Sequence, residues 1–178
     1  MAITRQTAYK LWIGDIITGE YHEEIGEWDP NYVLVKDKKV SRVNLIATVV
    51  DKFVSEDGSS GNIEIDDGSG SIKVKVWKDD VKIIKNVNIG NLILLIGRIR
   101  KFNNEIYTTP EGIKALNNAL WSRVRRLELE KEFGKREIVH DDSIQKIQIE
   151  TTIESPISVS ESTRQKIMNS IGKEEESN

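Results

Sequence analysis

The fold is decided by one alternating stretch, Asn62-Ile63-Glu64-Ile65-Asp66-Asp67-Gly68-Ser69-Gly70-Ser71-Ile72-Lys73-Val74-Lys75-Val76-Trp77. On both sides of its centre, apolar and polar residues alternate with a period of two, which is the pattern of a half-buried β-strand. The centre itself, Asp67-Gly68-Ser69-Gly70, consists of residues that favour tight turns. The stretch therefore predicts a β-hairpin with strands at residues 62–66 and 71–77.

Three further strands are expected around this hairpin. Each is rich in β-branched or apolar residues and is followed by turn-forming residues or by proline. They are residues 41–54, 92–102 and 105–109. A short helix is expected at Asp79–Lys85, with Asp79 or Asp80 as its cap. Five strands at short spacing, with a break between the third and the fourth, predict a mainly β, five-stranded Greek-key barrel with the layout of the OB-fold.

The chain outside the barrel, which we expect at residues 41–110, divides into three parts. Residues 1–40 are an aromatic-rich N-terminal arm that ends in a hairpin at residues 33–40. Residues 111–135 are expected to form one helix, because Pro110 fits a helix start and apolar residues then recur at helical spacing. Residues 136–178 form an acidic flexible tail, in which residues 161–171 could form one short helix.

The charge of the chain is unevenly distributed. The 178 residues include 26 Lys and Arg against 29 Asp and Glu, a net charge of -3. Residues 136–178 hold 5 basic and 9 acidic residues, which leaves 21 basic and 20 acidic residues for the rest. The acidity belongs mostly to the tail, so it does not argue against a nucleic-acid-binding barrel.

Several classes of function are excluded by composition. The absence of cysteine excludes a disulfide framework, a thiolate metal site and a cysteine nucleophile, and two histidines leave little for metal or general-base chemistry. No apolar run approaches the roughly 20 residues that span a bilayer, and the first residues lack a signal-peptide core. We therefore expect a cytoplasmic, non-enzymatic protein without a metal, a cofactor, a small-molecule substrate or a membrane partner.

Two of the expected strands carry the same pattern on the face away from the core. In residues 71–77 the aliphatic side chains share one face, while two lysines and then a tryptophan share the other. In residues 92–102, two arginines and then a phenylalanine lie opposite Ile99. Phosphates attract cations, and unstacked bases pack on aromatic rings. The candidates for contact with single-stranded nucleic acid are therefore Lys73, Lys75, Trp77, Arg98, Arg100 and Phe102. The alternative is a solvated sheet face over which a tryptophan and a phenylalanine are tucked.

Four segments, taken in order, carry a resemblance to a known family. They are Asp29–Val35, Lys39–Phe53, Asp66–Trp77 and Ile96–Tyr107. Together they resemble the archaeal form of the middle, single-OB subunit of heterotrimeric replication protein A, over about residues 9–133. The resemblance implies that Trp77 and Phe102 stack with bases and that the four neighbouring cations contact phosphates.

The resemblance also implies partners and a cellular role. The helix at residues 111–135 would bundle with equivalent helices of two other replication protein A subunits, and a nucleoid-associated complex would protect single-stranded DNA in replication, repair and recombination. The residues expected at this interface are Ile113, Leu116, Leu120, Trp121, Val124 and Leu127. Only residues 162–171 resemble the first helix of the winged-helix docking domain found in archaeal relatives, which puts recruitment of repair factors by that route in doubt.

Each of these features also has an interpretation as a structural element that does not contact nucleic acid or another subunit. The helix could close one end of its own barrel, and the arginines at positions 123, 125 and 126 are expected to be solvated or paired with Glu128 and Glu130. Trp12 and Trp28 are expected to pack on the barrel, although a base-stacking role is an alternative. The whole chain could instead be a structural OB-fold assembly subunit, of a telomere-capping or translation-associated kind, with little direct contact with nucleic acid.

Overall fold

A computed structural model describes residues 6–24 and 30–136, so the expectations for Trp28 and for the tail with its helix at 161–171 lie outside the described residues. The elements of the described chain are α1 (Ile13–Thr18), β1 (Glu20–His22), β2 (Tyr32–Val35), β3 (Lys38–Val40), β4 (Arg42–Val54), β5 (Ser60–Asp66), β6 (Ser71–Trp77), the 3-10 helix η1 (Lys78–Asp80), α2 (Val81–Lys85), β7 (Leu92–Phe102), β8 (Glu105–Ala115) and α3 (Leu120–Phe133).

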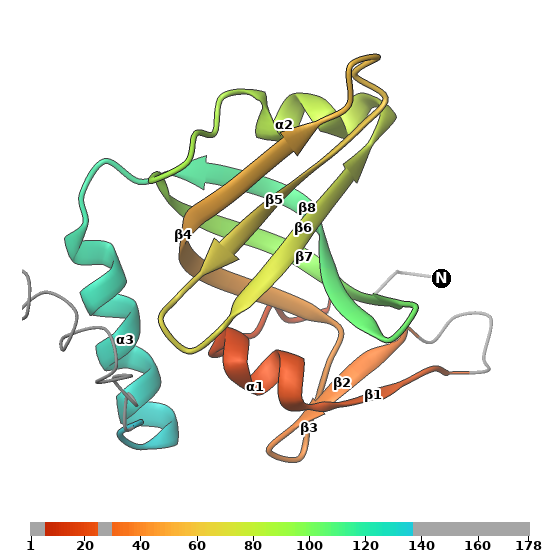
Figure 1. Cartoon of the computed structure of the whole chain (residues 1–178). Coiled ribbons are helices and arrows are strands. Elements are labelled where there is room, and N and C mark those ends of the chain that lie inside the picture. The colour runs from red at the N-terminus through yellow and green to blue at the C-terminus, as the bar shows by residue number, and fades with distance from the viewer. Residues whose placement is uncertain (1–5, 25–29, 137–178) are drawn as a thin grey trace, which may run out of the picture. The chain divides into compact units, whose positions relative to one another are not determined.

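Five strands form a closed barrel in the order β4-β5-β6-β8-β7 (Figure 1). All neighbouring strands are antiparallel except β6 and β8, which are parallel. The interior is filled mainly by aliphatic side chains of β4, β5, β6 and β7, among them Leu45, Ile63, Val74, Leu95 and Ile99, none of which is more than 1% exposed. The predicted five-stranded OB-fold barrel is therefore confirmed.

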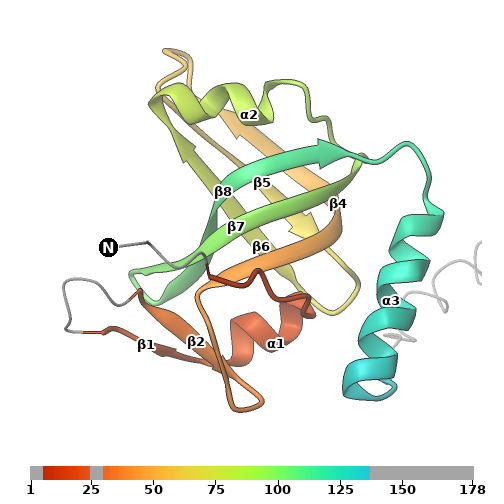
Figure 2. The same ribbon diagram turned by 180° about the vertical axis from the view of Figure 1, so that it is seen from behind.

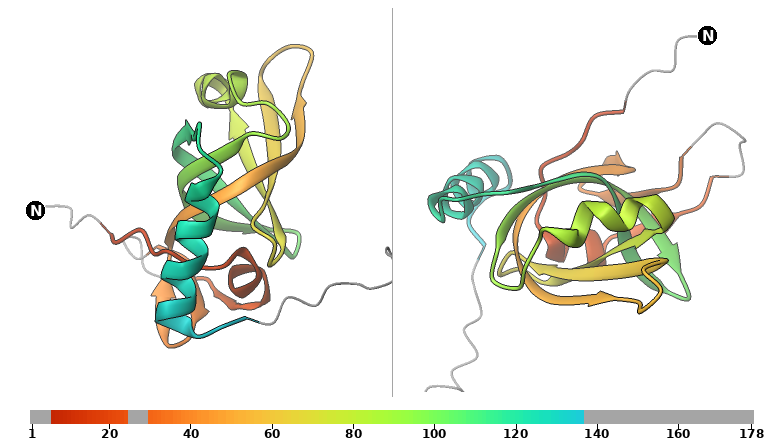
Figure 3. Two further views of the ribbon diagram at one scale, coloured as in Figure 1. Left: turned by 90° about the vertical axis from the view of Figure 1, so that its left-hand side faces the viewer. Right: turned by 90° about the horizontal axis from the view of Figure 1, so that it is seen from above.

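The two ends of the barrel are covered differently (Figures 1 and 3). Helix α2 lies over one end, and α1 with the small sheet β1-β2-β3 lies at the other. The β5–β6 turn holds α1 in place, because the Ile13 N–H donates to Asp67 Oδ2 at 2.9 Å and the Gly14 N–H donates to Ser69 Oγ at 2.9 Å. Trp12, at 7% exposure, packs against the barrel as expected.

The turns follow the residue types that the sequence offers. The hairpin predicted at 33–40 is confirmed as β2 and β3, and its connecting residues Lys36 and Asp37 both have positive φ. Asp66 and Asp67 accept backbone N–H groups within the β5–β6 turn. Asp80 occupies the N-cap position of α2, as predicted, but its side chain makes no capping hydrogen bond.

The predicted helix start at residue 111 is wrong, because β8 continues to Ala115 and α3 begins at Leu120. Pro110 lies opposite Gly97, where the register of β7 and β8 shifts, and a proline is tolerated at such a bulge because no ladder hydrogen bond is needed there. Ile113 pairs with Leu95 and packs against the barrel core. The Leu116 N–H donates to the Leu92 carbonyl at 2.8 Å, so both predicted interface residues precede the helix.

Helix α3 lies beside its own barrel (Figures 2 and 3). Arg125 is buried and donates to the Asn44 carbonyl at 2.6 Å and to Asn44 Oδ1 at 2.8 Å. Leu129 is 1% exposed, and Lys10 pairs with Glu128 at 2.8 Å. Arg125 also pairs with Glu128, as Arg126 does with Glu130, so the expected pairing of these two arginines is confirmed.

Candidate nucleic-acid interface

The six predicted nucleic-acid contacts all lie on the outer face of the barrel. Along β6, the aliphatic side chains are at most 2% exposed, whereas Trp77 is 46% exposed. Along β7, Ile99 is fully buried and Phe102 is 64% exposed. The face assignments made from strand periodicity are therefore correct, and contact with nucleic acid stays a prediction.

The Trp77 indole is held by its place in the chain and by one neighbour. Strand β6 ends at Trp77, and the chain then turns through Lys78, which has the left-handed φ of 53° and donates its N–H to the Ser59 carbonyl. The Trp77 ring lies edge-on to the Tyr107 ring, with centroids 6.2 Å apart and planes at 71°. An edge-to-face contact restrains the indole and leaves ring surface available for a flat ligand.

Phe102 is presented by a tight hairpin. The β7–β8 connection is Asn103-Asn104, with φ values of 47° and 63°, which is the backbone of a two-residue type I′ turn. Asparagine tolerates this conformation better than most residues. Phe102 therefore lies at the tip of the β7–β8 hairpin, with its ring exposed on the outside of the barrel.

The two lysines of β6 share one carboxylate. Glu105, the first residue of β8, lies 2.8 Å from Lys73 Nζ and 2.7 Å from Lys75 Nζ. The hydrogen bond to Glu105 raises the pKa of Lys73, and the hydrogen bond from Lys73, with that from Lys75, lowers the pKa of Glu105. Two ammonium groups and one carboxylate together leave one net positive charge at this place.

The two arginines of β7, Arg98 and Arg100, differ in whether a carboxylate pairs with them. Arg98 pairs with Glu111 at 2.8 Å, and Arg42 pairs with the same carboxylate. Burial raises the pKa of Glu111, but the hydrogen bonds from Arg42 and Arg98 outweigh it and keep that pKa below its usual value. Within residues 6–24 and 30–136, Arg100 makes no ion pair. Its register partner on β8 is Tyr107.

Two residues of this face were missed from the sequence. Tyr107 contacts Trp77 and lies with its ring centroid 4.5 Å from Lys75 Nζ, and Glu105 neutralises part of the lysine charge. Both alternate with the buried Thr108 along β8 in the same way that the predicted residues alternate on β6 and β7. The strand period would have placed Tyr107 on this face had it been applied to residues 105–109.

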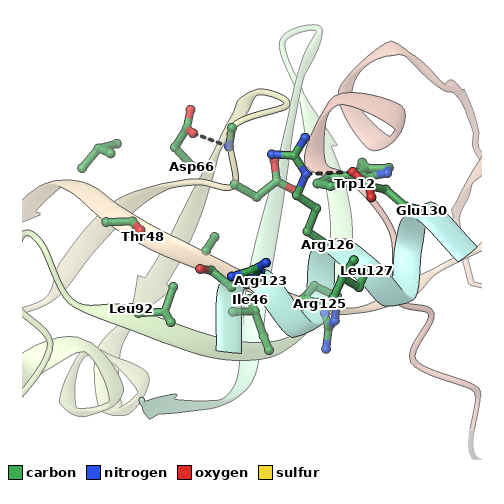
Figure 4. Close-up of a pocket in the computed structure, with 15 residues that line it drawn as sticks. Trp12, Ile46, Thr48, Asp66, Leu92, Arg123, Arg125, Arg126, Leu127 and Glu130 are labelled. Atoms are coloured by element: carbon green, nitrogen blue, oxygen red, sulfur yellow. Dashed lines mark hydrogen bonds and ion pairs between the residues drawn. The ribbon is translucent and has the colours of Figure 1, made fainter. Parts of the chain in front are cut away.

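A second surface is formed by α3. Most of the predicted helix interface residues are uncovered, with exposures between 43% and 60% for Leu120, Trp121, Val124 and Leu127. On the side of α3 that faces the barrel there is a groove of about 570 Å³ (Figure 4). Its walls combine apolar and basic side chains, including Trp12, Ile46, Leu92, Arg123, Arg126 and Leu127.

The described residues contain no group of three His, Asp or Glu side chains that could hold a metal ion. In the same part of the chain, every helix is too short or too polar to cross a membrane. The outer face of the barrel offers the exposed rings of Trp77 and Phe102 and cations that are partly neutralised by Glu105 and Glu111. These groups suit a ligand that stacks and carries diffuse negative charge.

Comparison with known proteins agrees with this geometry. Residues 43–116 match the family model tRNA_anti-codon, described as an OB-fold nucleic acid binding domain. This match begins in β4 and ends one residue beyond β8, so it spans the barrel. The barrel is therefore an OB-fold that is similar to nucleic-acid-binding domains of this description. No curated protein matches the chain significantly.

Solved structures of low sequence identity share the fold. A chain of a replication protein A heterotrimer bound to ssDNA aligns with a TM-score of 0.59 at 15% identity, covering 71% of this chain and 95% of the other. A chain of the S. pombe Stn1-Ten1 complex aligns with a TM-score of 0.60 at 14% identity, covering 82% and 99%. A chain of yeast RPA bound to ssDNA gives 0.55 at 19% identity, covering 74% and 92%.

Proposed function

We propose that this protein binds single-stranded DNA on the outer face of the barrel, mainly by base stacking on Trp77 and Phe102. The observation that carries the proposal is the exposure of both rings on one face, at the ends of β6 and β7, with Lys73 and Lys75 on the same face. Stacking contributes about 1–3 kcal/mol per base, so two rings are enough for weak binding. The lysines and arginines of the face would contribute a smaller, salt-dependent part.

We also propose that the chain is one subunit of a heterotrimer that resembles replication protein A, in the cytoplasm of an archaeal cell. Such a complex would protect single-stranded DNA during replication, repair and recombination. One of the similar structures is of a replication protein A heterotrimer and another is of a Stn1-Ten1 complex, so each of these two comes from an assembly of subunits. The exposed apolar side chains of α3 support an interface there, since exposed apolar clusters mark interaction surfaces.

A second candidate is a structural assembly subunit that scarcely touches DNA. The ion pairs of Glu105 with Lys73 and Lys75, and of Glu111 with Arg98, favour it, because paired cations attract phosphates less strongly. In that case α3 would carry the function, and the aromatic residues of the barrel face would be solvated or would contact a protein.

Titration of a fluorescent oligothymidylate with the purified full chain separates the two candidates. With the stacking account, Trp77→Ala and Phe102→Ala each weaken binding by about five- to 20-fold, and binding weakens as salt rises. The control is Ile89→Ala, which removes an equally exposed apolar side chain from the loop between α2 and β7. If neither aromatic variant changes the affinity by threefold, the structural candidate is favoured.

The assembly claim is tested by co-purification. Leu120→Asp combined with Leu127→Asp places charges on the exposed stripe of α3 and is expected to abolish co-purification with the other subunits. Because both side chains are exposed, the variant should keep the thermal stability of the isolated chain. Persistent co-purification would move the interface to another surface.

A further inference from the structure

A third aromatic side chain, Phe53, is exposed on the barrel, and a bulge in β4 puts it there. Before the bulge, Val43, Leu45 and Val49 are buried, so an unbroken strand would direct residue 53 into the core. The register of β4 against β5 shifts between Val49 and Asp51, which reverses the faces of the residues that follow. Phe53 is consequently 57% exposed.

The register of the sheet places Phe53 beside the face already described. Phe53 lies opposite Asn62 on β5, and Asn62 lies opposite Lys75 on β6. Directly opposed side chains of neighbouring strands share a face, so Phe53, Asn62 and Lys75 form one row on the outside of the barrel. Phe53 is two strand spacings, about 10 Å, from Lys75, and Trp77 follows two residues further along β6.

Charge favours this row over the neighbouring one as a path for a polyanion. In the adjacent row, Asp51 lies opposite Glu64, and Glu64 lies opposite Lys73. Two carboxylates side by side repel phosphates, whereas the row of Phe53, Asn62 and Lys75 consists of a ring, an amide and a cation, with Glu105 of β8 paired to Lys75. A single strand that leaves Trp77 across the sheet is therefore directed toward Phe53.

We propose that Phe53 is a third stacking platform for a nucleobase, so that the site extends from the end of β7 across β8, β6 and β5 to the end of β4. This inference rests on the proposed function, because it lengthens the same single-stranded DNA site. The ligand is one more unpaired base of a polythymidine-like strand, held by its flat face, with the neighbouring phosphate near Lys75.

The test compares Phe53→Leu with Phe53→Trp in the full chain. Leucine keeps an apolar side chain but removes the aromatic face, and tryptophan restores it, so a merely apolar role would not distinguish the two. We expect Phe53→Leu to weaken binding of a twelve-residue oligothymidylate by about five- to tenfold and Phe53→Trp to stay within twofold of the natural protein. Since the ring is exposed, both variants should melt as the natural protein does.

A second readout does not depend on affinity. An oligothymidylate that carries photoreactive halogenated uracil cross-links to aromatic side chains against which the base stacks. Trypsin cleaves after Lys52 and Lys73, so a cross-link at Phe53 is found in the peptide of residues 53–73. We expect this adduct in the natural chain and its loss in Phe53→Leu.

The outcomes separate the two levels of the proposal. If Trp77→Ala weakens binding while Phe53→Leu leaves it unchanged and no adduct forms at Phe53, the third platform is refuted and the proposed function stands. If none of the aromatic variants on this face changes binding, the proposed function fails and the platform with it. If Phe53→Leu weakens binding and Phe53→Trp restores it, the platform is supported.

Discussion

Removing the charge of Glu105 should strengthen DNA binding. Glu105 holds Lys73 and Lys75 at 2.8 and 2.7 Å, which are the distances of charge-assisted hydrogen bonds. A phosphate that approaches either lysine must compete with this carboxylate. Glu105→Gln keeps the size of the side chain but leaves one acceptor oxygen where the carboxylate offers one to each lysine, and it raises the net charge of the group from +1 to +2.

The size of the effect follows from counterion release. Each phosphate contact on a single strand adds about 0.7 to the slope of log K against the logarithm of salt concentration. Freeing one lysine therefore gains about fivefold in affinity at 0.1 M salt relative to 1 M salt, and freeing both gains about 25-fold. We expect Glu105→Gln to bind oligothymidylate about five- to 25-fold more tightly at 0.1 M salt, with a salt slope that is steeper by about 0.7–1.4.

The assay is fluorescence anisotropy of a labelled oligothymidylate at four or five salt concentrations. The matched control is Glu132→Gln on α3, which makes the same change of net charge. It releases Lys38 of β3, which belongs to the small sheet and not to the barrel strands that carry Trp77 and Phe102. An affinity gain as large in the control as in Glu105→Gln would show a general charge effect. An unchanged salt slope in Glu105→Gln would refute the view that Lys73 and Lys75 meet phosphates.

Three further predictions concern stability. Leu129→Ala, which truncates a fully buried side chain of α3, should lower the free energy of unfolding by about 2–4 kcal/mol in chemical denaturation, whereas Leu127→Ala, at an exposed position, should change it by less than about 0.5 kcal/mol. Gly97→Ala should destabilise by about 1–3 kcal/mol, because its new β-carbon would meet the Thr109 carbonyl oxygen at 2.7 Å, and Gly112→Ala, which meets nothing within 4 Å, should be tolerated in the same denaturation experiment. Thermal melts should show stability that is kept above about pH 4.3 and lost as the pH falls further, because hydrogen bonds from lysines lower the pKa of two carboxyl groups below their unfolded values. These groups are Glu105 and Glu128, and replacing both by glutamine should flatten the loss.

The barrel could be predicted because each of its strands can be recognised from residues that are close together in the sequence. The alternation through residues 62–77 determines which side chains enter the core, and the structure buries the same ones. The same period placed Trp77 and Phe102 outside, and both are exposed. These features depend on the strand period of two and on turn residues close in sequence, and both can be read directly from the chain.

Other features depend on which strands pair and could not be predicted in that way. The apolar spacing from Ile113 onward fits a helix, yet Ile113 pairs with β7 because a bulge admits Pro110 into the ladder. The neutralisation of the two lysines by Glu105 requires β6 and β8 to be neighbours, although 30 residues separate Lys75 from Glu105. The exposure of Phe53 requires the bulge in β4, which shifts the strand period at a position where the sequence shows only a continuous β-branched run.

The most direct test of the central claim is the response of the tryptophan indole N–H signals in the NMR spectrum of the full chain to oligothymidylate. Trp77 on the aromatic face and Trp121 on α3 are almost equally exposed, at 46% and 50%, while Trp12 is buried. Trp77→Phe and Trp121→Phe assign the signals of these two tryptophans. We expect the Trp77 signal to shift and to saturate with added DNA while that of Trp121 stays in place. A saturating shift of Trp121 with an unmoved Trp77 would contradict the account, because DNA would then bind at α3 and not on the outer face of the barrel.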